Sequence, residues 1–514
     1  MVISDLAINN RLWDNYLTYT KKVGDVNFTG LLGYSYQSFE FSDSRATAQN
    51  FSQVLVEPKL EQNIDAFANN AGGADRSVVN NSSNRIDELQ SYFLRANVSF
   101  KDKYVLTASY RLDGSTRFGN ENVYGSFPSF ALKWRLSEEN FIPKNIFSDL
   151  GLRIGWGVTG NQEFGYNLWS QSKRFNDKTI NSENGNLEAG NFANISFNNF
   201  DLSWESTTQT NIGLDFGFVD NRISGSVEWY DRRTDDLLLR VEAAQPATQP
   251  FNWFNIPSDL QNTGIELTLN LAAIVTKDLK WNVSLNGAYN KNLLKNLGGA
   301  LLNTGAINGQ GLSGAYAQRI AEGYPLGSFF LREFGGFGNQ DNTIYPNGDV
   351  QDFVGKSGLP NFNAGITNSL SFKGFDFSVF LNGVFGAYIY NNTANALFTK
   401  GALNAGRNVT RDVLTSTEGA FNSPDVSTRF LESGDFVRLA NLTFGYNLPL
   451  GKDSKIRAIR FTVTGQNILT FTNYSGQDPE VNTNKQIDGI PSIGIDYTAY
   501  PRAKTWTLGA NISF

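Results

Sequence analysis

The sequence predicts an all-β protein, an antiparallel transmembrane β-barrel with about 15 strands present. Three observations predict this class. Apolar and polar residues alternate over many stretches of about ten residues. The 514 residues include 40 Phe, 20 Tyr and 49 Gly, while charged residues make up only 18%. Finally, the chain has no run of about 18 apolar residues, so a helical membrane protein is excluded.

The alternation is clear at the C-terminal end. Trp506, Leu508, Ile512 and Phe514 alternate with polar or small residues, so on a strand they share one face. Stretches of about ten residues are long enough to cross a bilayer at a tilt. A soluble β-sandwich is the alternative, but its strands usually have only about 5–6 residues. The strand length therefore favours a membrane barrel.

Short and long connections alternate along the chain. Outer-membrane barrels place short turns in the periplasm and long loops outside the cell, so the alternation assigns the two sides. Long loops are expected near 41–86, 160–206, 235–262, 294–362, 387–433 and 470–502. The strands are expected near 10–22, 26–40, 90–101, 103–113, 125–136, 150–159, 207–219, 222–233, 263–275, 279–291, 363–373, 375–386, 435–447, 456–468 and 503–514.

The number of predicted strands is odd. The segment 327–334 also looks extended, but we assign it to a loop excursion, since counting it would place the turn at 373–374 outside the cell. Single-chain bacterial barrels have even strand numbers and periplasmic termini. We therefore expect residues 1–514 to be the C-terminal portion of a barrel of about 22 strands. We expect this portion alone to form no stable barrel, because unpaired strand edges are costly in lipid.

The composition excludes several kinds of chemistry. The chain has no Cys and no His, so it has no thiol nucleophile, no imidazole base and no thiolate or imidazole metal ligand. Lys and Arg total 43 against 49 Asp and Glu, a net charge of −6, which disfavours a nucleic-acid partner. Carboxylate pairs such as Glu138-Glu139 and Asp235-Asp236 point to opposite faces on a strand. We expect no enzyme and no cofactor.

Several segments resemble one family in order and spacing. They include YVLTASYRLDGSTRFG at 104–119 and GQNILTFTNYSG at 465–476, which is followed by Asp478-Pro479-Glu480. Others lie at 124–130, 157–162, 204–213, 262–267, 322–327, 373–380 and 438–446. Together they resemble the C-terminal part of the SusC/RagA family of TonB-linked outer-membrane transporters. The resemblance does not cover the N-terminal features of that family, which are the signal sequence, the TonB box, the plug domain and the first barrel strands.

The resemblance implies a function in the bacterial outer membrane. A family member imports oligosaccharides or peptides with energy supplied through TonB, and a SusD-like lipoprotein covers it. This chain would supply the C-terminal barrel strands and extracellular loops, and TonB would act through the N-terminal plug and barrel part. Without that part, we expect no active import. The alternatives are a secreted β-rich glycan-binding protein or adhesin and, less favoured, an all-β carbohydrate hydrolase.

Aromatic residues in the long loops are the candidate ligand-binding residues, because their faces stack on sugar rings or grip peptides. The alternative is that they pack the loops together. The candidates are Tyr166, Trp169, Phe251, Trp253, Phe254 and Tyr316. The resemblance adds an assembly signal, an amphipathic last strand that ends in an aromatic residue. It comprises Trp506, Leu508, Ile512 and Phe514.

Charged residues complete the candidate set. Five cations from successive strands are expected to face the barrel interior, where they line a transport path or meet the plug, or else balance acidic residues on neighbouring strands. They are Arg95, Arg111, Lys133, Arg135 and Arg153. Asp341, Asp349 and Asp352 lie where the family often carries a calcium-like loop, but a calcium site needs six or more oxygen ligands. We therefore expect no metal.

Overall fold

The computed structural model describes residues 2–47, 79–119, 121–163, 199–242, 251–338, 342–450 and 456–514. Its main feature is a fifteen-stranded sheet in which every strand pairs with its neighbours in chain order. The strands are β1 (Val2–Val23), β2 (Val26–Thr47), β3 (Val79–Phe100), β4 (Tyr104–Ser115), β5 (Tyr124–Arg135), β6 (Phe147–Asn161), β7 (Glu205–Phe218), β8 (Ile223–Glu242), β9 (Phe251–Val275), β10 (Leu279–Lys295), β15 (Phe362–Phe372), β16 (Phe375–Phe385), β19 (Phe436–Leu448), β20 (Ala458–Thr472) and β22 (Thr505–Ser513).

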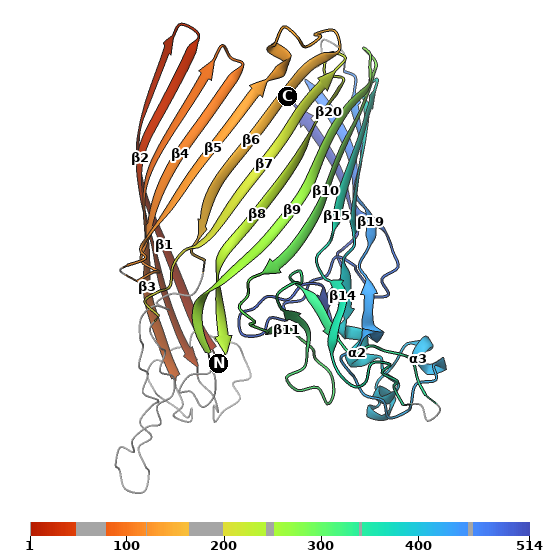
Figure 1. Ribbon diagram of the computed structural model, residues 1–514. Coiled ribbons are helices and arrows are strands. Elements are labelled where there is room, and N and C mark those ends of the chain that lie inside the picture. Colours follow the sequence, from red (N-terminus) through yellow and green to blue (C-terminus); the bar gives the residue numbers. More distant parts are fainter. Residues whose placement is uncertain are drawn as a thin grey trace, which may run out of the picture.

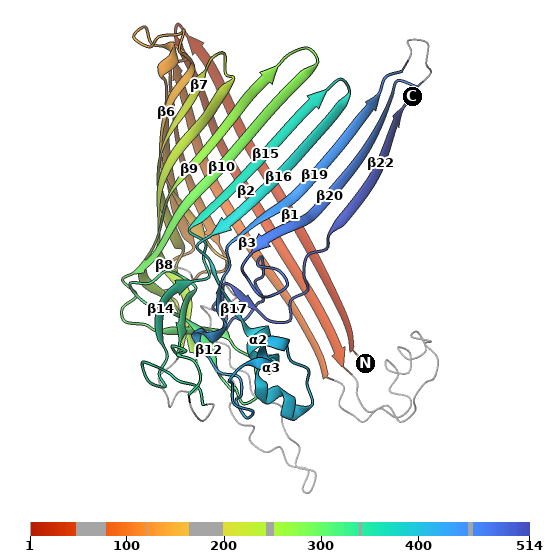
Figure 2. The same ribbon diagram turned by 90° about the vertical axis from the view of Figure 1, so that its right-hand side faces the viewer.

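The sheet is a tall, twisted wall that curves around one side (Figure 1), and the turned view in Figure 2 shows the strands crossing it at a tilt. All neighbouring pairs in it are antiparallel. Within the described residues the sheet is open, because β1 and β22 each have one neighbour. All fifteen predicted strands are confirmed.

The two ends of the wall differ as predicted. Short turns lie at the end where β22 finishes, and the long connections lie at the opposite end, where β1 starts (Figure 1). The turn between β15 and β16 has only two residues, Lys373 at φ 47° and Gly374 at φ 93°. Two successive positive φ angles give the turn type whose twist matches antiparallel strands.

Several strands extend further into the long connections than predicted. β8 continues to Glu242 and β9 begins at Phe251, so the loop predicted for 235–262 is wrong over most of its length. The cause is a bulge at Asp236, where φ is 58° and the register shifts. The bulge interrupts the alternation, and Leu237 and Leu239 beyond it pack on a buried apolar cluster. The loop predicted for 41–86 is likewise shorter, since β2 ends at 47 and β3 starts at 79.

Two small sheets and short helices fold at the end with the long connections (Figure 1). The first sheet contains β11 (Leu302–Ala306), β12 (Tyr316–Ile320), β13 (Ser328–Leu331) and β14 (Asp352–Ser357). The second contains β18 (Leu431–Ser433), β17 (Tyr388–Asn391) and β21 (Ile495–Asp496). The helices are α2 (Asn392–Leu397) and α3 (Arg411–Thr415). β13 covers half of 327–334 and belongs to the first small sheet, not to the main sheet, so the assignment of that segment to a loop excursion is confirmed.

These small elements share a core of their own. Phe329, Tyr390 and Ile495, from β13, β17 and β21, are fully buried in one apolar cluster. The main sheet differs, because one of its faces is apolar and exposed: Leu106, Ile212, Leu267 and similar side chains are 43–46% exposed. So much apolar surface is unusual for a soluble monomer and suits contact with lipid.

Aromatic residues gather where the strands meet the short turns. Phe100, Tyr104 and Trp134 on β3, β4 and β5 stack in a row, with ring centroids 6.3 Å and 6.0 Å apart. Phe375 on β16 and Tyr446 on β19 stack at 4.4 Å. Rows of this kind mark the level at which a barrel leaves the hydrocarbon. Among the described residues, no helix is long and apolar enough to span a membrane.

Candidate functional site

The face of the sheet opposite the apolar one, here called the inner face, carries a ladder of opposite charges across β5 to β8. Lys133 Nζ lies 3.2 Å from Asp215 Oδ2, and Arg153 Nε lies 3.0 Å from Asp215 Oδ1. Arg153 Nη1 extends the ladder to Glu228 Oε2 at 2.9 Å. Gly213 leaves room for Arg153, since a Cβ there would lie 2.8 Å from its Nη2. The ladder ties four strands together.

Two of the other three predicted interior cations, Arg111 and Arg135, have local partners as well. Arg111 Nε lies 2.7 Å from Asp113 Oδ1, and its Nη2 donates to the Ser91 hydroxyl at 2.8 Å. Arg135 donates to the Asp102 carbonyl at 3.2 Å beside a short turn, while Arg95 is exposed. Ion pairs between strands therefore hold Lys133 and Arg153, in agreement with the charge-balance interpretation given above, whereas the acidic partner of Arg111 lies on its own strand.

A large polar cavity, here called the inner pocket, lies where β7 to β10 meet segments 323–325 and 357–361. Its volume is about 950 Å³, at the upper end of the range for ligand sites. Tyr230 Oη donates to Asn290 Oδ1 at 2.5 Å, and Arg232 Nη2 donates to Gln209 Oε1 at 3.1 Å. With Glu266 also lining it, the pocket offers donors and acceptors to a polar ligand.

A smaller cavity of about 300 Å³ lies among the long connections, and Tyr316 lines it. Arg240 of β8 and Asp488 form an ion pair of 3.2 Å on its wall. Arg319 Nη2 donates to Tyr316 Oη at 2.6 Å, and its guanidinium lies 3.9 Å from the ring centroid of Phe330. Tyr316 is therefore half-buried, and its hydroxyl is held by an arginine.

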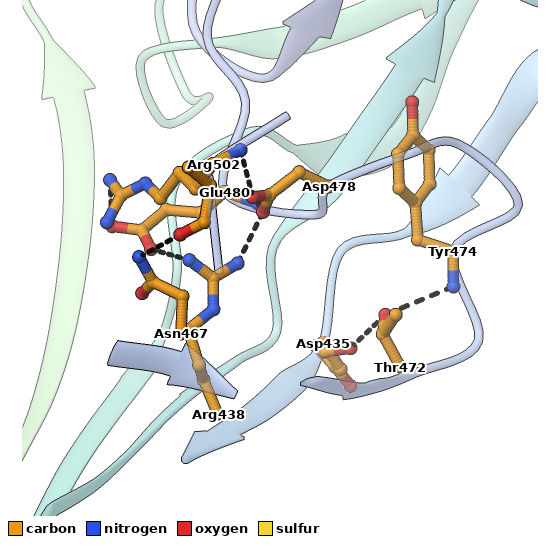
Figure 3. A network of polar contacts seen from close by, with 9 residues as sticks. Asp435, Arg438, Asn467, Thr472, Tyr474, Asp478, Glu480 and Arg502 are labelled. Carbon is orange, nitrogen blue, oxygen red and sulfur yellow. Dashed lines mark hydrogen bonds and ion pairs between the residues drawn. The ribbon is translucent and has the colours of Figure 1, made fainter. Parts of the chain in front are cut away.

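An arginine on β19 holds the last long connection against the sheet. Arg438 is 2% exposed and donates to Asp478 and, at 3.0 Å, to Glu480. Figure 3 shows its guanidinium between the two carboxylates, with Arg502 on the far side of Glu480 at 2.7 Å. Burial opposes ionisation of Asp478, but hydrogen bonds from the Glu480 backbone N–H and the Arg438 guanidinium outweigh it and lower its pKa. The Asp-Pro-Glu tripeptide thus has a structural role.

The remaining predicted ligand residues are not brought together. Tyr166 and Trp169 lie outside the described residues. Phe251, Trp253 and Phe254 begin β9 and are not in a loop, a correction caused by the strand extension beyond Asp236. Trp253 is half-buried and Phe254 is 44% exposed, and neither lines the two cavities above. Ligand contact by these residues stays a prediction.

Other predictions concern metal binding and assembly. Asp349 forms an ion pair with Arg332 at 2.6 Å, while Asp341 lies outside the described residues. No group of three or more acidic residues able to hold a metal occurs among the residues that the structure describes. Trp506, Leu508, Ile512 and Phe514 are all exposed at the end of the sheet. Their role in assembly stays a prediction.

Sequence reasoning missed Arg438 and the residues of the inner pocket. Arg438 meets carboxylates 40 and 42 positions away in the chain. Tyr230 and Asn290 are 60 positions apart. Only the strand pairing brings such residues together. For Arg438, the Asp478-Pro479-Glu480 tripeptide was the one signal in the sequence, because it supplies both carboxylate partners.

An open antiparallel sheet with one apolar, aromatic-bordered face and one charged inner face defines part of the wall of an outer-membrane β-barrel. The family model described as "TonB dependent receptor-like, beta-barrel" matches residues 4–513. The chain therefore belongs to the TonB-dependent receptor β-barrel family. This finding confirms the predicted all-β membrane barrel and its place in the outer membrane.

Curated relatives narrow the resemblance. The chain is 32% identical to TonB-dependent receptor P3 of Formosa agariphila, over 98% of this chain and 52% of the relative. It is 31% identical to TonB-dependent receptor SusC of Bacteroides thetaiotaomicron, over 98% of this chain and 50% of the relative. The chain spans about half the length of the curated relatives it matches. The predicted likeness to SusC is confirmed, and these relatives are receptors, not enzymes.

A solved structure supports the fold. The structure of the RagAB peptide transporter matches with a TM-score of 0.83 at 24% identity, covering 100% of this chain and 56% of that chain. At this identity the likeness concerns the fold alone.

Proposed function

We propose that the chain supplies the C-terminal barrel strands and extracellular loops of a TonB-dependent importer of oligosaccharides or peptides. The observation that carries the proposal is the inner pocket, a polar cavity of about 950 Å³ on the inner face beside the folded connections. Its size and its mixture of donors and acceptors fit a short polar oligomer better than a single small solute. The likeness to RagAB, which is described as a peptide transporter, supports uptake as the process.

Two partners belong to the proposal. A SusD-like lipoprotein covers the end with the long connections, where the small sheets and helices present a folded surface. TonB acts through the N-terminal plug and barrel part, which supplies the coupling to energy. The family and the likeness to the RagAB structure support both partners.

The test uses the host organism. A strain with the gene disrupted should lose uptake of one labelled substrate class, either oligosaccharides or peptides, and regain it from a plasmid copy. An uncoupler that collapses the proton gradient should abolish the restored uptake, because TonB-dependent import needs that energy. Unchanged uptake of both classes in the disrupted strain would contradict the proposal.

A further inference from the structure

A second cavity lies on the inner face of β2, β3 and β4, on a different part of the wall from the inner pocket. We call it the wall pocket. Its volume is about 390 Å³, and its lining includes two aromatic rings, several charged groups and an amide: Phe39, Phe41, Asp87, Glu88, Arg117, Glu163 and Gln162. In the strand register Phe39 lies opposite Asp87, so the apolar and acidic parts of the pocket are adjacent.

The apolar part is a pair of aromatic rings. Phe39 and Phe41 stand two residues apart on β2, so both point to the same face of the sheet. Their rings stack with centroids 6.5 Å apart and planes 19° apart. The guanidinium of Arg85, opposite Phe41 in the register, lies 4.3 Å from the centroid of the Phe41 ring. With Leu89, which also lines the pocket, the two rings form its apolar part.

The polar part contains two acceptors that the protein does not satisfy. Asp87 is only 4% exposed, and its Oδ2 lies 3.1 Å from Arg117 Nη2. Its Oδ1 is buried without a hydrogen-bond donor in the described part of the chain, and so is Oε1 of Gln162. Buried acceptors without donors are rare and costly. Two of them in one pocket indicate a ligand that brings donors.

The charges around Asp87 limit what that ligand is. Arg117 Nη2 lies 3.1 Å and Arg85 Nε lies 3.5 Å from Asp87 Oδ2. The two guanidinium groups already compensate Asp87, and the further carboxylate of Glu163, 3.5 Å from Arg117 Nη1, lies at the exposed rim of the pocket. The two buried acceptors therefore need donors but no positive charge, and a neutral hydroxyl group can donate to both of them. Sugar rings combine hydroxyl donors with an apolar face that stacks on aromatic rings.

We propose that the wall pocket is a subsite for a neutral sugar unit, with the ring on Phe39 and Phe41 and hydroxyl groups donating to Asp87 Oδ1 and Gln162 Oε1. The inference rests on the proposed import function and narrows its substrate to neutral oligosaccharides. The sugar would bind on the inner face near the long connections, where a substrate enters from outside.

The test uses the transporter as its host assembles it in the outer membrane, together with the N-terminal plug and barrel part that the proposed function includes, purified in detergent. It is probed with an array of short neutral glucans, mannans, xylans and galactans, and with a set of tryptic peptides. The wild-type protein should bind at least one neutral glycan. Phe41→Leu keeps an apolar side chain but removes the aromatic face, and Gln162→Leu removes one acceptor. Each variant should bind the glycan about tenfold more weakly.

Matched controls separate binding from folding. Phe216→Leu is the control for Phe41→Leu and lies on β7, outside the wall pocket. Gln486→Leu is the control for Gln162→Leu and lies at an exposed site on the last long connection. Both controls should bind like the wild type, and all variants should keep the heat-modifiable gel migration of a folded barrel. Unchanged glycan affinity in Phe41→Leu and Gln162→Leu would overturn the subsite.

Transport distinguishes failure of the subsite from failure of the function. If the wild-type protein binds only peptides and cells import peptides through it, the sugar subsite is wrong and import stands. If cells lacking the protein import both substrate classes normally, the proposed function itself is wrong.

Discussion

At the scale of single residues, Arg438 makes the clearest prediction. Its guanidinium is almost fully buried and is shared by Asp478 and Glu480. Arg438→Met leaves two carboxylates facing an apolar side chain, and removal of one partner from a buried pair is strongly destabilising. We expect the free energy of unfolding to fall by about 3 kcal/mol. Urea unfolding in detergent micelles, followed by tryptophan fluorescence, measures the change.

Arg460 provides the matched control. It pairs with Asp376 at 2.6 Å, but its side chain is 37% exposed. Exposed ion pairs contribute less than about 1 kcal/mol, so Arg460→Met should shift the unfolding transition only slightly. Equal losses in the two variants would show that burial of Arg438 is not the source of its effect.

At the scale of elements, the last long connection should loosen in acid. The pKa of Asp478 is lowered in the folded protein from an ordinary value of 3.8. Its ionised form therefore stabilises the fold above that value, and this contribution is lost as the pH falls from 3.8 through the lowered pKa. Pepsin cleavage within 473–504 should accelerate over this window. Asp478→Asn, which does not titrate, is the reference, and an identical pH profile in both proteins would contradict the prediction.

The two faces of β9 should respond oppositely to charge. Leu267 lies on the apolar face and is 43% exposed, whereas Thr268 points to the inner face. Leu267→Lys should destabilise the folded protein by about 2–4 kcal/mol, as lysine does on the lipid face near the middle of a barrel. Thr268→Lys should cost much less. Folded yield in the outer membrane, measured by heat-modifiable migration, compares them, and equal yields would refute the assignment of faces.

The elements also show how far the sequence alone leads. Period-two alternation located every strand of the sheet, because one apolar face must be repeated on each strand. It located strand ends poorly. At Asp236, for example, a bulge interrupts the alternation of apolar and polar residues although the strand continues. It also missed Asp87 and Gln162, since each is an ordinary polar residue in the sequence. Only the pairing of strands reveals that their oxygens are buried without donors.

At the scale of the whole molecule, the alternation of connections predicts the orientation in the membrane. Phe421 lies among the long connections and is 90% exposed, and Asp220 lies in the short turn between β7 and β8. The chain has no Cys, so Phe421→Cys and Asp220→Cys each introduce a single reporter thiol. A membrane-impermeant maleimide should label Phe421→Cys on intact cells. It should label Asp220→Cys only after the outer membrane is permeabilised, because that turn faces the periplasm. The reverse pattern would contradict this orientation, and it would place the inner pocket and the wall pocket at the wrong end for capture from outside.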